Sequence, residues 1–313
     1  MKILNKKISM GYVLTALFST AALVYSLGYK MAMDKFNDVV SYTHEKQKMY
    51  SALSEIDYNI REDCIVDINE DRILSGISKG YVDGLNCDSC KFFDKSEYKE
   101  YTNNLSQNVS DIKFSRQNNE ILYIKFNNIL NNSSKYVKEN IDSAISEGIK
   151  GIVIDLRNCD NSIDEEVFKI IQNLVPSGLT IGAVNKKGAE EVVCRSEGSE
   201  LNVKISVLVN EKTSGTCELI AASLKNNKNA KIIGTKTAGN AVRLKKITLA
   251  DDSVLVFPNA CYVVFGEENT FRKGVETDYE IPLDKEKEEL LKNSSINFED
   301  DIQVQKAVDW INS

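Results

Sequence analysis

The chain has 313 residues, of which 42% are apolar and 27% are charged, and its formal net charge at pH 7 is −7. That apolar content is ample for one sizeable buried core. The negative charge and the lack of a basic stripe argue against a phosphate-binding surface, so no nucleic acid partner is expected. The sequence also lacks a glycine-rich phosphate loop and a cluster of metal ligands, so no cofactor and no metal are expected.

The first element is an uncharged, mostly apolar segment at residues 8–29. As a helix it spans roughly 30 Å, about the thickness of a bilayer's hydrocarbon core. Lys2, Lys6 and Lys7 precede it, so the positive-inside tendency predicts a cytoplasmic N-terminus and an extracytoplasmic chain beyond the segment. A cleaved signal peptide is the alternative. The length of the apolar segment favours an uncleaved single-pass anchor in the cell membrane.

The segment from Met31 to Asp83 is polar and follows a helical pattern. Its apolar residues recur at intervals of three and four, as in an amphipathic stripe. These residues are Val40, Met49, Leu53, Ile56, Ile60, Leu74 and Ile77. The pattern predicts either a coiled juxtamembrane stalk or a helical cap on the main domain.

Seven cysteines occur, and an odd number leaves at least one thiol unpaired in an oxidising compartment. Cys87 and Cys90 are the only close pair. A zinc site would need a second pair or nearby histidines, and a thioredoxin-like pair would stand at a strand-to-helix junction. The spacing favours a local disulfide or two inert thiols over a thiol redox role.

From Ile121 onward strands and helices alternate, which predicts a layered α/β domain. The run Gly151–Leu156 is almost continuously apolar, as in a strand that is covered on both faces. The other expected strands are Ile121–Phe126, Leu179–Ala183, Val203–Val209, Lys231–Ile233, Val242–Thr248, Val254–Phe257 and Cys261–Phe265. The expected helices are Ser134–Ile149, Glu165–Leu174 and Thr216–Lys225.

The most informative segment is Leu208–Leu244, LVNEKTSGTCELIAASLKNNKNAKIIGTKTAGNAVRL. It resembles the core of the carboxyl-terminal processing, or tail-specific, serine proteases, which reads L-V-N-x-x-S-A-S-A-S-E-I, then a helix, then G-x-x-T-F-G-K-G. Anchoring on Asn210 and Glu218 needs no gap, and Gly234 and Thr237 then fall on their counterparts. The resemblance implies a spiral ββα core like that of the crotonase and Clp-protease folds.

Four further segments support the resemblance, which covers about residues 70–310. Gly80–Leu85 and Phe92–Tyr98 are similar to the helical region before the PDZ domain of these proteases. Gly274–Asp278 is similar to their G-I-x-P-D, and Asp301–Val308 to their closing D-x-Q-L-x-K-A helix. The order of the segments along the chain makes chance similarity improbable.

The PDZ domain of the family, which presents the substrate's C-terminus, has no counterpart in the sequence. Only the Asn-, Ser- and Gln-rich segment Lys99–Glu120 separates Tyr98 from the strand that begins at Ile121. Even a marginal independent core needs more than about 40 residues. The resemblance therefore implies a member without the peptide-capture domain.

The family hydrolyses peptide bonds with a Ser–Lys dyad, in which a lysine of depressed pKa deprotonates the attacking hydroxyl. The gapless alignment places Gly215 at the nucleophile and Asn240 at the lysine. Glycine has no side chain that could attack a carbonyl group, and the asparagine amide cannot act as a base. Loss of the nucleophile alone costs on the order of 10⁶ in rate.

The oxyanion loop is altered as well. Asp155–Asn158 is similar to the start of the family's D-L-R-x-N-x-G-G, but Cys159 replaces its Asn, and Asn161 and Ser162 replace its glycines. Side chains at these positions are expected to crowd or redirect the backbone donors. Together with Thr216 they would line a degenerate cleft.

A relocated nucleophile is the alternative. Ser214 or Cys217 would attack, assisted by Lys236 or Lys212. Against it, Cys217 is expected to be a small buried apolar residue, and Ser214 and Thr216 are expected to cap the helix that follows. A Ser–His triad is nearly excluded, because the only histidine, His44, follows the apolar segment.

We therefore expect three regions: a cytoplasmic end and transmembrane helix at 1–30, a helical stalk at 31–107, and a tail-specific protease-like α/β domain at 118–313. The expected function is that of a catalytically inactive pseudoprotease that binds a peptide or a partner protein in the cleft. The alternative is an active serine-type peptidase. No feature of the sequence predicts the oligomeric state.

Overall fold

The computed structural model describes residues 10–107, 111–199, 201–225, 227–293 and 296–313. The chain divides into two compact units, Met1–Ile73 and Leu74–Ser313. Each unit is described by itself.

The first unit consists mainly of one long helix, α1 (Met10–Asp63). Its part from Met10 to Asn37 contains an 18-residue stretch with a mean hydropathy of 1.5 and is long and apolar enough to cross a membrane, although a signal sequence has the same properties. The first two residues of the expected apolar segment and the three lysines before it lie outside the described residues. The end of α1 is tied to the next helix by Arg61, which pairs with Asp57 and Glu70.

The helical pattern expected from Met31 to Asp83 is confirmed as α1 and α2 (Glu70–Asp83), which are separated by a short break at residues 64–69. The side chain of Asn69 accepts a hydrogen bond from the backbone N–H of Arg72, which satisfies one free donor of the first turn of α2.

The second unit is built on two β-sheets. The larger has the strand order β11-β8-β7-β4-β3-β2 and is parallel except for the β2–β3 pair. Its strands are β2 (Ile112–Gln117), β3 (Ile121–Phe126), β4 (Gly151–Asp155), β7 (Lys204–Val209), β8 (Ala230–Gly234) and β11 (Tyr279–Glu280).

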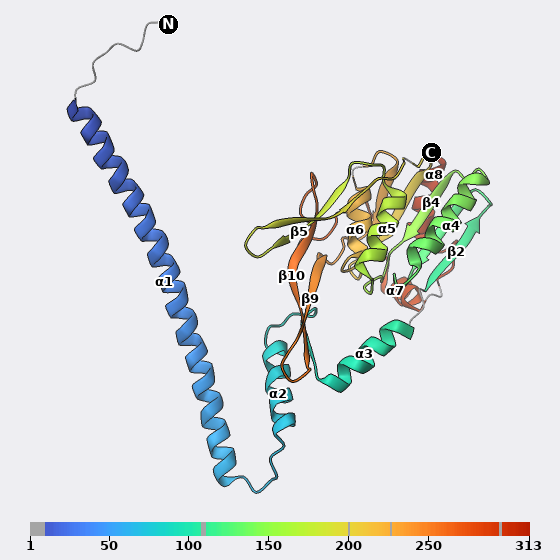
Figure 1. Ribbon diagram of the computed structural model, residues 1–313. Helices are drawn as coiled ribbons and strands as arrows, with labels where there is room; N and C mark the ends of the chain where they lie inside the picture. Colours follow the sequence, from blue (N-terminus) through green and yellow to red (C-terminus); the bar gives the residue numbers. More distant parts are fainter. Residues whose placement is uncertain (1–9, 108–110, 200, 226, 294–295) are drawn as a thin grey trace. The chain divides into compact units, whose positions relative to one another are not determined.

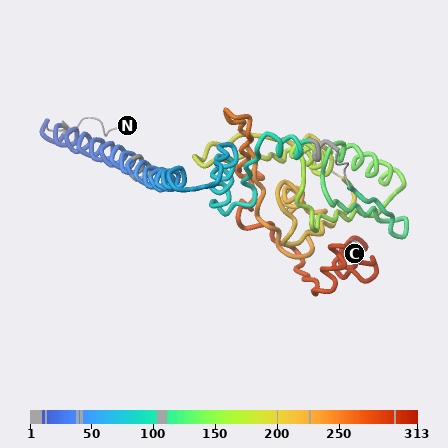
Figure 2. Tube along the Cα trace, turned by 90° about the horizontal axis from the view of Figure 1, so that it is seen from below, coloured from blue at the N-terminus to red at the C-terminus, as the bar shows by residue number. Residues whose placement is uncertain are grey.

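Helices cover both faces of this sheet (Figure 1). One face carries α4 (Ser133–Ser146), α5 (Asp164–Leu174) and α6 (Cys217–Leu224), and the other carries α8 (Ile302–Asn312). Figure 2 shows the C-terminal segment and the green α4 on opposite sides of the unit. This three-layer arrangement explains why the central strands are apolar on both faces.

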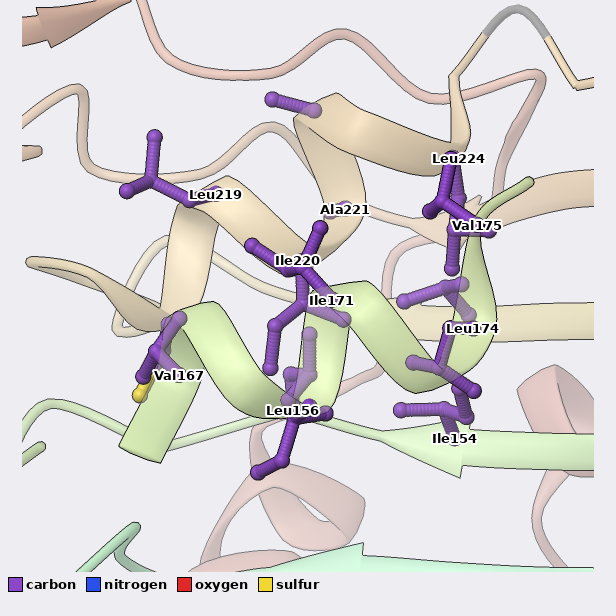
Figure 3. Close-up of a cluster of buried hydrophobic side chains, with 14 of the residues drawn as sticks. Ile154, Leu156, Val167, Ile171, Leu174, Val175, Leu219, Ile220, Ala221 and Leu224 are labelled. Carbon is purple, nitrogen blue, oxygen red and sulfur yellow. The ribbon is translucent and has the colours of Figure 1, made fainter. Parts of the chain in front are cut away.

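The side chains of β4 show how the alternation divides the core. Ile152 and Ile154 point to the cluster formed with α4, α5 and α6, whereas Val153 belongs to the smaller cluster under α8. Figure 3 shows the larger cluster, in which Ile171 of α5 and Ile220 of α6 pack together above β4.

The smaller sheet has the order β1-β10-β5-β6, and β9 also pairs with β10. Its strands are β1 (Lys91–Phe93), β5 (Thr180–Asn185), β6 (Glu190–Arg195), β9 (Val242–Thr248) and β10 (Val254–Val264). The two strands expected at Val254–Phe257 and Cys261–Phe265 are one strand. Its register with β9 shifts between Pro258 and Ala260, where proline cannot donate to the ladder.

The remaining helices are α3 (Lys95–Gln107) and α7 (Lys285–Lys292). The segment Lys99–Glu120, expected to be a polar connection, contains most of α3 and all of β2, and residues 108–110 lie outside the described residues. Polar composition concealed β2, because it is an edge strand with alternating half-buried side chains.

Candidate functional site

The candidate site lies where the adjacent parallel strands β4 and β7 end. Asn210 follows β7, and its amide accepts a hydrogen bond from the backbone N–H of Asn158 (3.0 Å) and donates one to the Asn158 side chain (2.9 Å). Farther along, Ser214 N donates to Cys159 O (3.0 Å). The loop after β4 and the loop before α6, both singled out in the sequence, are therefore bonded to each other.

Gly215 occupies the turn immediately before α6. Its φ is +65°, in the left-handed region that glycine adopts without strain. A Cβ at this position would meet no atom closer than the carbonyl oxygen of Asp160, at 3.9 Å. The turn therefore keeps open space where a side chain could project, but it carries no atom that could attack a carbonyl group.

Asn240 stands in the loop before β9 and is connected to Gly215 through a buried carboxylate, Glu218. Oε1 of Glu218 accepts the Asn240 N–H (2.7 Å), and Oε2 accepts the Gly239 N–H (2.7 Å) and the Thr237 hydroxyl (2.5 Å). Burial raises the pKa of Glu218, and these bonds, together with one from the Gly215 backbone, partly offset the rise. The carboxylate of Glu218 thus connects the backbones of the two expected dyad positions, Gly215 and Asn240.

Hydroxyl groups occupy the side of the site that the oxyanion loop borders. Ser162 and Thr216 are joined by a hydrogen bond of 2.6 Å between their hydroxyl oxygens. Thr216 also bonds Asp164, whose carboxylate accepts a bond from the Tyr262 hydroxyl at 2.5 Å. Burial raises the pKa of Asp164. Ser162 is therefore anchored to the helix that follows Gly215, and Asn161 is exposed.

Cys159 and Cys217 form a disulfide whose Cα atoms are 6.3 Å apart, and both residues are fully buried. Cys217 is buried in the hydrophobic core, as expected of a small apolar residue, but its sulfur is bonded to Cys159 and so is not the free thiol that a reserve nucleophile requires. The alignment contained a usable signal, since it placed Cys159 in the oxyanion loop and Cys217 two residues after the nucleophile position, at the start of α6.

The lysines proposed to assist a relocated nucleophile are engaged elsewhere or exposed. Lys236 Nζ forms an ion pair of 2.5 Å with Glu276, and Lys212 is exposed. Within the described ranges, no hydrogen bond connects a lysine nitrogen to the Ser214 hydroxyl. The helix-capping role expected of Ser214 and Thr216 is also absent there, since α6 has no side-chain cap bond.

The Cys87–Cys90 turn also reaches the site. The hydroxyl of Ser89, inside the turn, accepts a hydrogen bond of 3.3 Å from the Asn240 side chain. Cys87 and Cys90 are half-buried free thiols with sulfur atoms 2.6 Å apart. Burial raises the pKa of Cys90 to about 11. Neither this contact nor the Ser162–Thr216 bond was foreseen from the sequence.

A separate cavity of about 350 Å³ lies near the C-terminal helices, and neither Gly215 nor Asn240 lines it. Buried charges form its floor. Arg157 pairs with Asp155 (2.6 Å) and Asp301 (2.7 Å), and Lys125 pairs with Asp155 (3.1 Å). Burial alone would raise the pKa of Asp155, but the two cations hold it well below its usual range. These residues connect β3, β4 and α8.

The fold and the paired loops define a tail-specific protease-like α/β protein. The sequence profile of peptidase family S41 matches residues 120–281, just over half of the 313 residues. The chain belongs to peptidase family S41. The expected fold class is thereby confirmed.

Two curated relatives and one solved structure illustrate the similarity. The carboxyl-terminal-processing protease of Synechocystis is 23% identical over 66% of this chain and 47% of its own length. A probable CtpA-like serine protease of Staphylococcus aureus strain N315 is 28% identical over 52% of this chain and 33% of its own. The photosystem II D1 C-terminal processing protease has a TM-score of 0.51 at 18% identity, over 56% of this chain and 49% of that one. The matched regions thus span less than half the length of these proteins.

Proposed function

We propose that the chain is a membrane-anchored, extracytoplasmic pseudoprotease that binds a peptide or a partner protein in the degenerate cleft. The main support is position 215, which combines empty space with the absence of any reacting side-chain atom. The loops at the two expected dyad positions are connected, because Glu218 accepts hydrogen bonds from the backbone of both. A connected site without a nucleophile is suited to binding rather than to turnover.

The membrane part of the proposal is supported by α1, the one helix among the described residues that is long and apolar enough to span a bilayer. With the lysines before it, the positive-inside tendency favours a cytoplasmic N-terminus, so the α/β domain would face outward.

The binding proposal can be tested with the full chain in detergent and a library of fluorescein-labelled, unstructured decapeptides. We expect saturable binding without cleavage. A Gly215→Leu variant fills the open space, so it should weaken binding on the order of tenfold, which corresponds to about 1.4 kcal/mol. Gly188→Leu is the matched control, because Gly188 also has a positive φ and open surroundings but stands in another turn.

The alternative, an active serine-type peptidase with a relocated nucleophile, has less support. Cys217 is bonded to Cys159, and Lys236 is paired with Glu276. The same peptide library decides between the two functions, since cleavage that disappears in a Ser214→Ala variant would replace the pseudoprotease proposal. Peptides that neither bind nor are cleaved would refute both.

A further inference from the structure

The turn from Cys87 to Cys90 is fixed at both ends by regular structure. Before it, α2 ends in a tight turn in which Leu85 N donates to Val82 O (3.0 Å). After it, β1 begins at once and pairs with β10. The turn itself is closed by a bond of 2.9 Å from Cys90 N to Cys87 O. A change in the conformation of the turn is therefore not readily absorbed by the neighbouring α2 and β1.

Ser89, in the middle of this turn, contacts the side chain of Asn240, which the alignment places at the position of the family's lysine. Asn240 Nδ2 donates to Ser89 Oγ (3.3 Å), while the Asn240 backbone is held by Glu218. The strand β9 begins two residues after Asn240 and pairs with β10, as β1 does. The turn and the Asn240 loop are thus carried by the same sheet, and Ser89 of the turn contacts the side chain of Asn240.

The two thiols are placed for reversible oxidation. Their sulfurs are 2.6 Å apart, so a disulfide can form with little backbone movement. Burial raises the pKa of the Cys90 thiol to about 11, so little of it is thiolate at neutral pH and the first attack falls to Cys87. The oxidant belongs to the class of exchangeable disulfides, such as a thiol–disulfide oxidoreductase or a small disulfide.

The exchange is balanced. The Cys87 thiolate attacks the oxidant's disulfide, forms a mixed disulfide and releases one thiol. Cys90, once deprotonated, then attacks the Cys87 sulfur and releases the second thiol. The protein loses two electrons and two protons, and the oxidant gains both as two thiols.

We propose that Cys87 and Cys90 form a reversible disulfide site that controls access to the cleft at Asn240. When the disulfide is closed, the turn is held on Asn240 through Ser89. When it is open, as in the structure, the contact is made but the turn is held only by its backbone bond, the end of α2 and the short pairing of β1, so the turn can leave Asn240 more readily than when the disulfide restrains it. The effect on peptide binding rests on the pseudoprotease function proposed above, whereas the redox site itself does not.

The test uses the full chain in detergent, equilibrated with mixtures of reduced and oxidised dithiothreitol. Alkylation and mass spectrometry report the Cys87–Cys90 bond, and hydrogen exchange reports the segment around Asn240. We expect this segment to exchange roughly fivefold more slowly in the oxidised form. Ser89→Ala should remove that protection although the disulfide still forms.

A Cys87→Ser/Cys90→Ser variant should match the reduced form at every potential. This variant also separates the turn from the buried Cys159–Cys217 disulfide, because a redox response that persists in it arises there. Cys64→Ser is the matched control, since Cys64 is an exposed free cysteine outside this unit, and it should respond like the parent protein.

The outcomes separate the two proposals. Failure of Cys87 and Cys90 to oxidise, or equal exchange in both forms, overturns the redox site. Equal peptide binding in both forms leaves the binding function intact but overturns the control of access. Redox-dependent exchange without any peptide binding leaves the redox site intact and refutes the binding function.

Discussion

Position 215 combines a backbone that glycine adopts readily with empty space beyond its Cα. Serine could enter this space without a clash, at a cost of about 1–2 kcal/mol for the left-handed backbone. The residue type at position 215, and not a collapsed backbone, therefore keeps a nucleophilic side chain from this turn. At the other dyad position, the backbone of Asn240 is already fixed by Glu218.

Restoring the dyad should therefore recover some hydrolysis. We expect the Gly215→Ser/Asn240→Lys protein to cleave unstructured peptides measurably, but weakly, because Ser162 still occupies a glycine position of the oxyanion loop. Gly215→Ser alone should remain inert and unfold at a slightly lower temperature. Release of labelled peptide fragments measures the activity, and equal activity in the single and double variants would contradict a lysine-dependent dyad.

The buried Glu218 carboxylate should make the stability of the protein depend on pH. Its folded pKa is raised by burial, so the folded state holds its proton at higher pH than the unfolded state, whose pKa is near 4.5. This contribution to stability is complete below pH 4.5 and is lost as pH rises through the folded pKa. Urea unfolding from pH 4 to 8 should show this fall in the parent protein.

Glu218→Gln should remove that fall. At pH 7 it should also cost about 2 kcal/mol, because the amide cannot accept all of the donors now facing the carboxylate. Thr235→Val is a suitable control, since Thr235 bonds an exposed carboxylate nearby. Identical pH profiles for the parent and Glu218→Gln proteins would show that Glu218 does not titrate in this range.

At the scale of elements, the buried charges Asp155, Arg157 and Asp301 join the central strand β4 to the C-terminal helix α8. Arg157 is 1% exposed, and three of its nitrogens have partners on Asp155, Gln303 or Asp301. Removing one partner of such a network leaves an unpaired buried charge. The packing of α8 on the sheet therefore depends on Asp155 and Arg157. The sequence resemblance had assigned these two residues to the oxyanion loop.

Arg157→Met should lower the free energy of unfolding by about 3–5 kcal/mol in urea titrations at pH 7. Arg243→Met, which breaks a partly exposed pair with Glu191, should lower it by about 1 kcal/mol or less. Asp155 has a depressed pKa, so its stabilisation is present above pH 3.8 and is lost as pH falls below that value. A similar loss in both variants would show that the network contributes little.

At the scale of the whole molecule, the apolar helix predicts that the full chain binds to membranes, whereas the α/β unit without this helix should be released from them. If residues 8–29 are an uncleaved anchor, the full chain should stay with membranes after an alkaline carbonate wash, and a chain lacking residues 1–30 should be released. Mass spectrometry of the membrane-bound protein should find the first residues intact. A mature chain that lacks the apolar segment would instead identify a signal peptide.

Local patterns predicted most elements of the larger unit well, because apolar runs and periodicity are local properties. The strands Ile121–Phe126 and Val242–Thr248 were predicted with their observed ends. By contrast, β2 and β6 were missed because edge strands expose many polar side chains. One bulged strand was divided into two at Pro258, since proline normally ends a strand.

The sequence alone determined the α/β class, the family resemblance, and the residue types at positions 215 and 240, because these depend on composition, period and spacing. Only the tertiary structure decided which distant groups meet. It joined Cys159 to Cys217, placed Glu218 between the two dyad positions, and brought Ser89 to Asn240. Such contacts depend on how strands and loops far apart in the chain are assembled, and a single sequence carries no local signal for them.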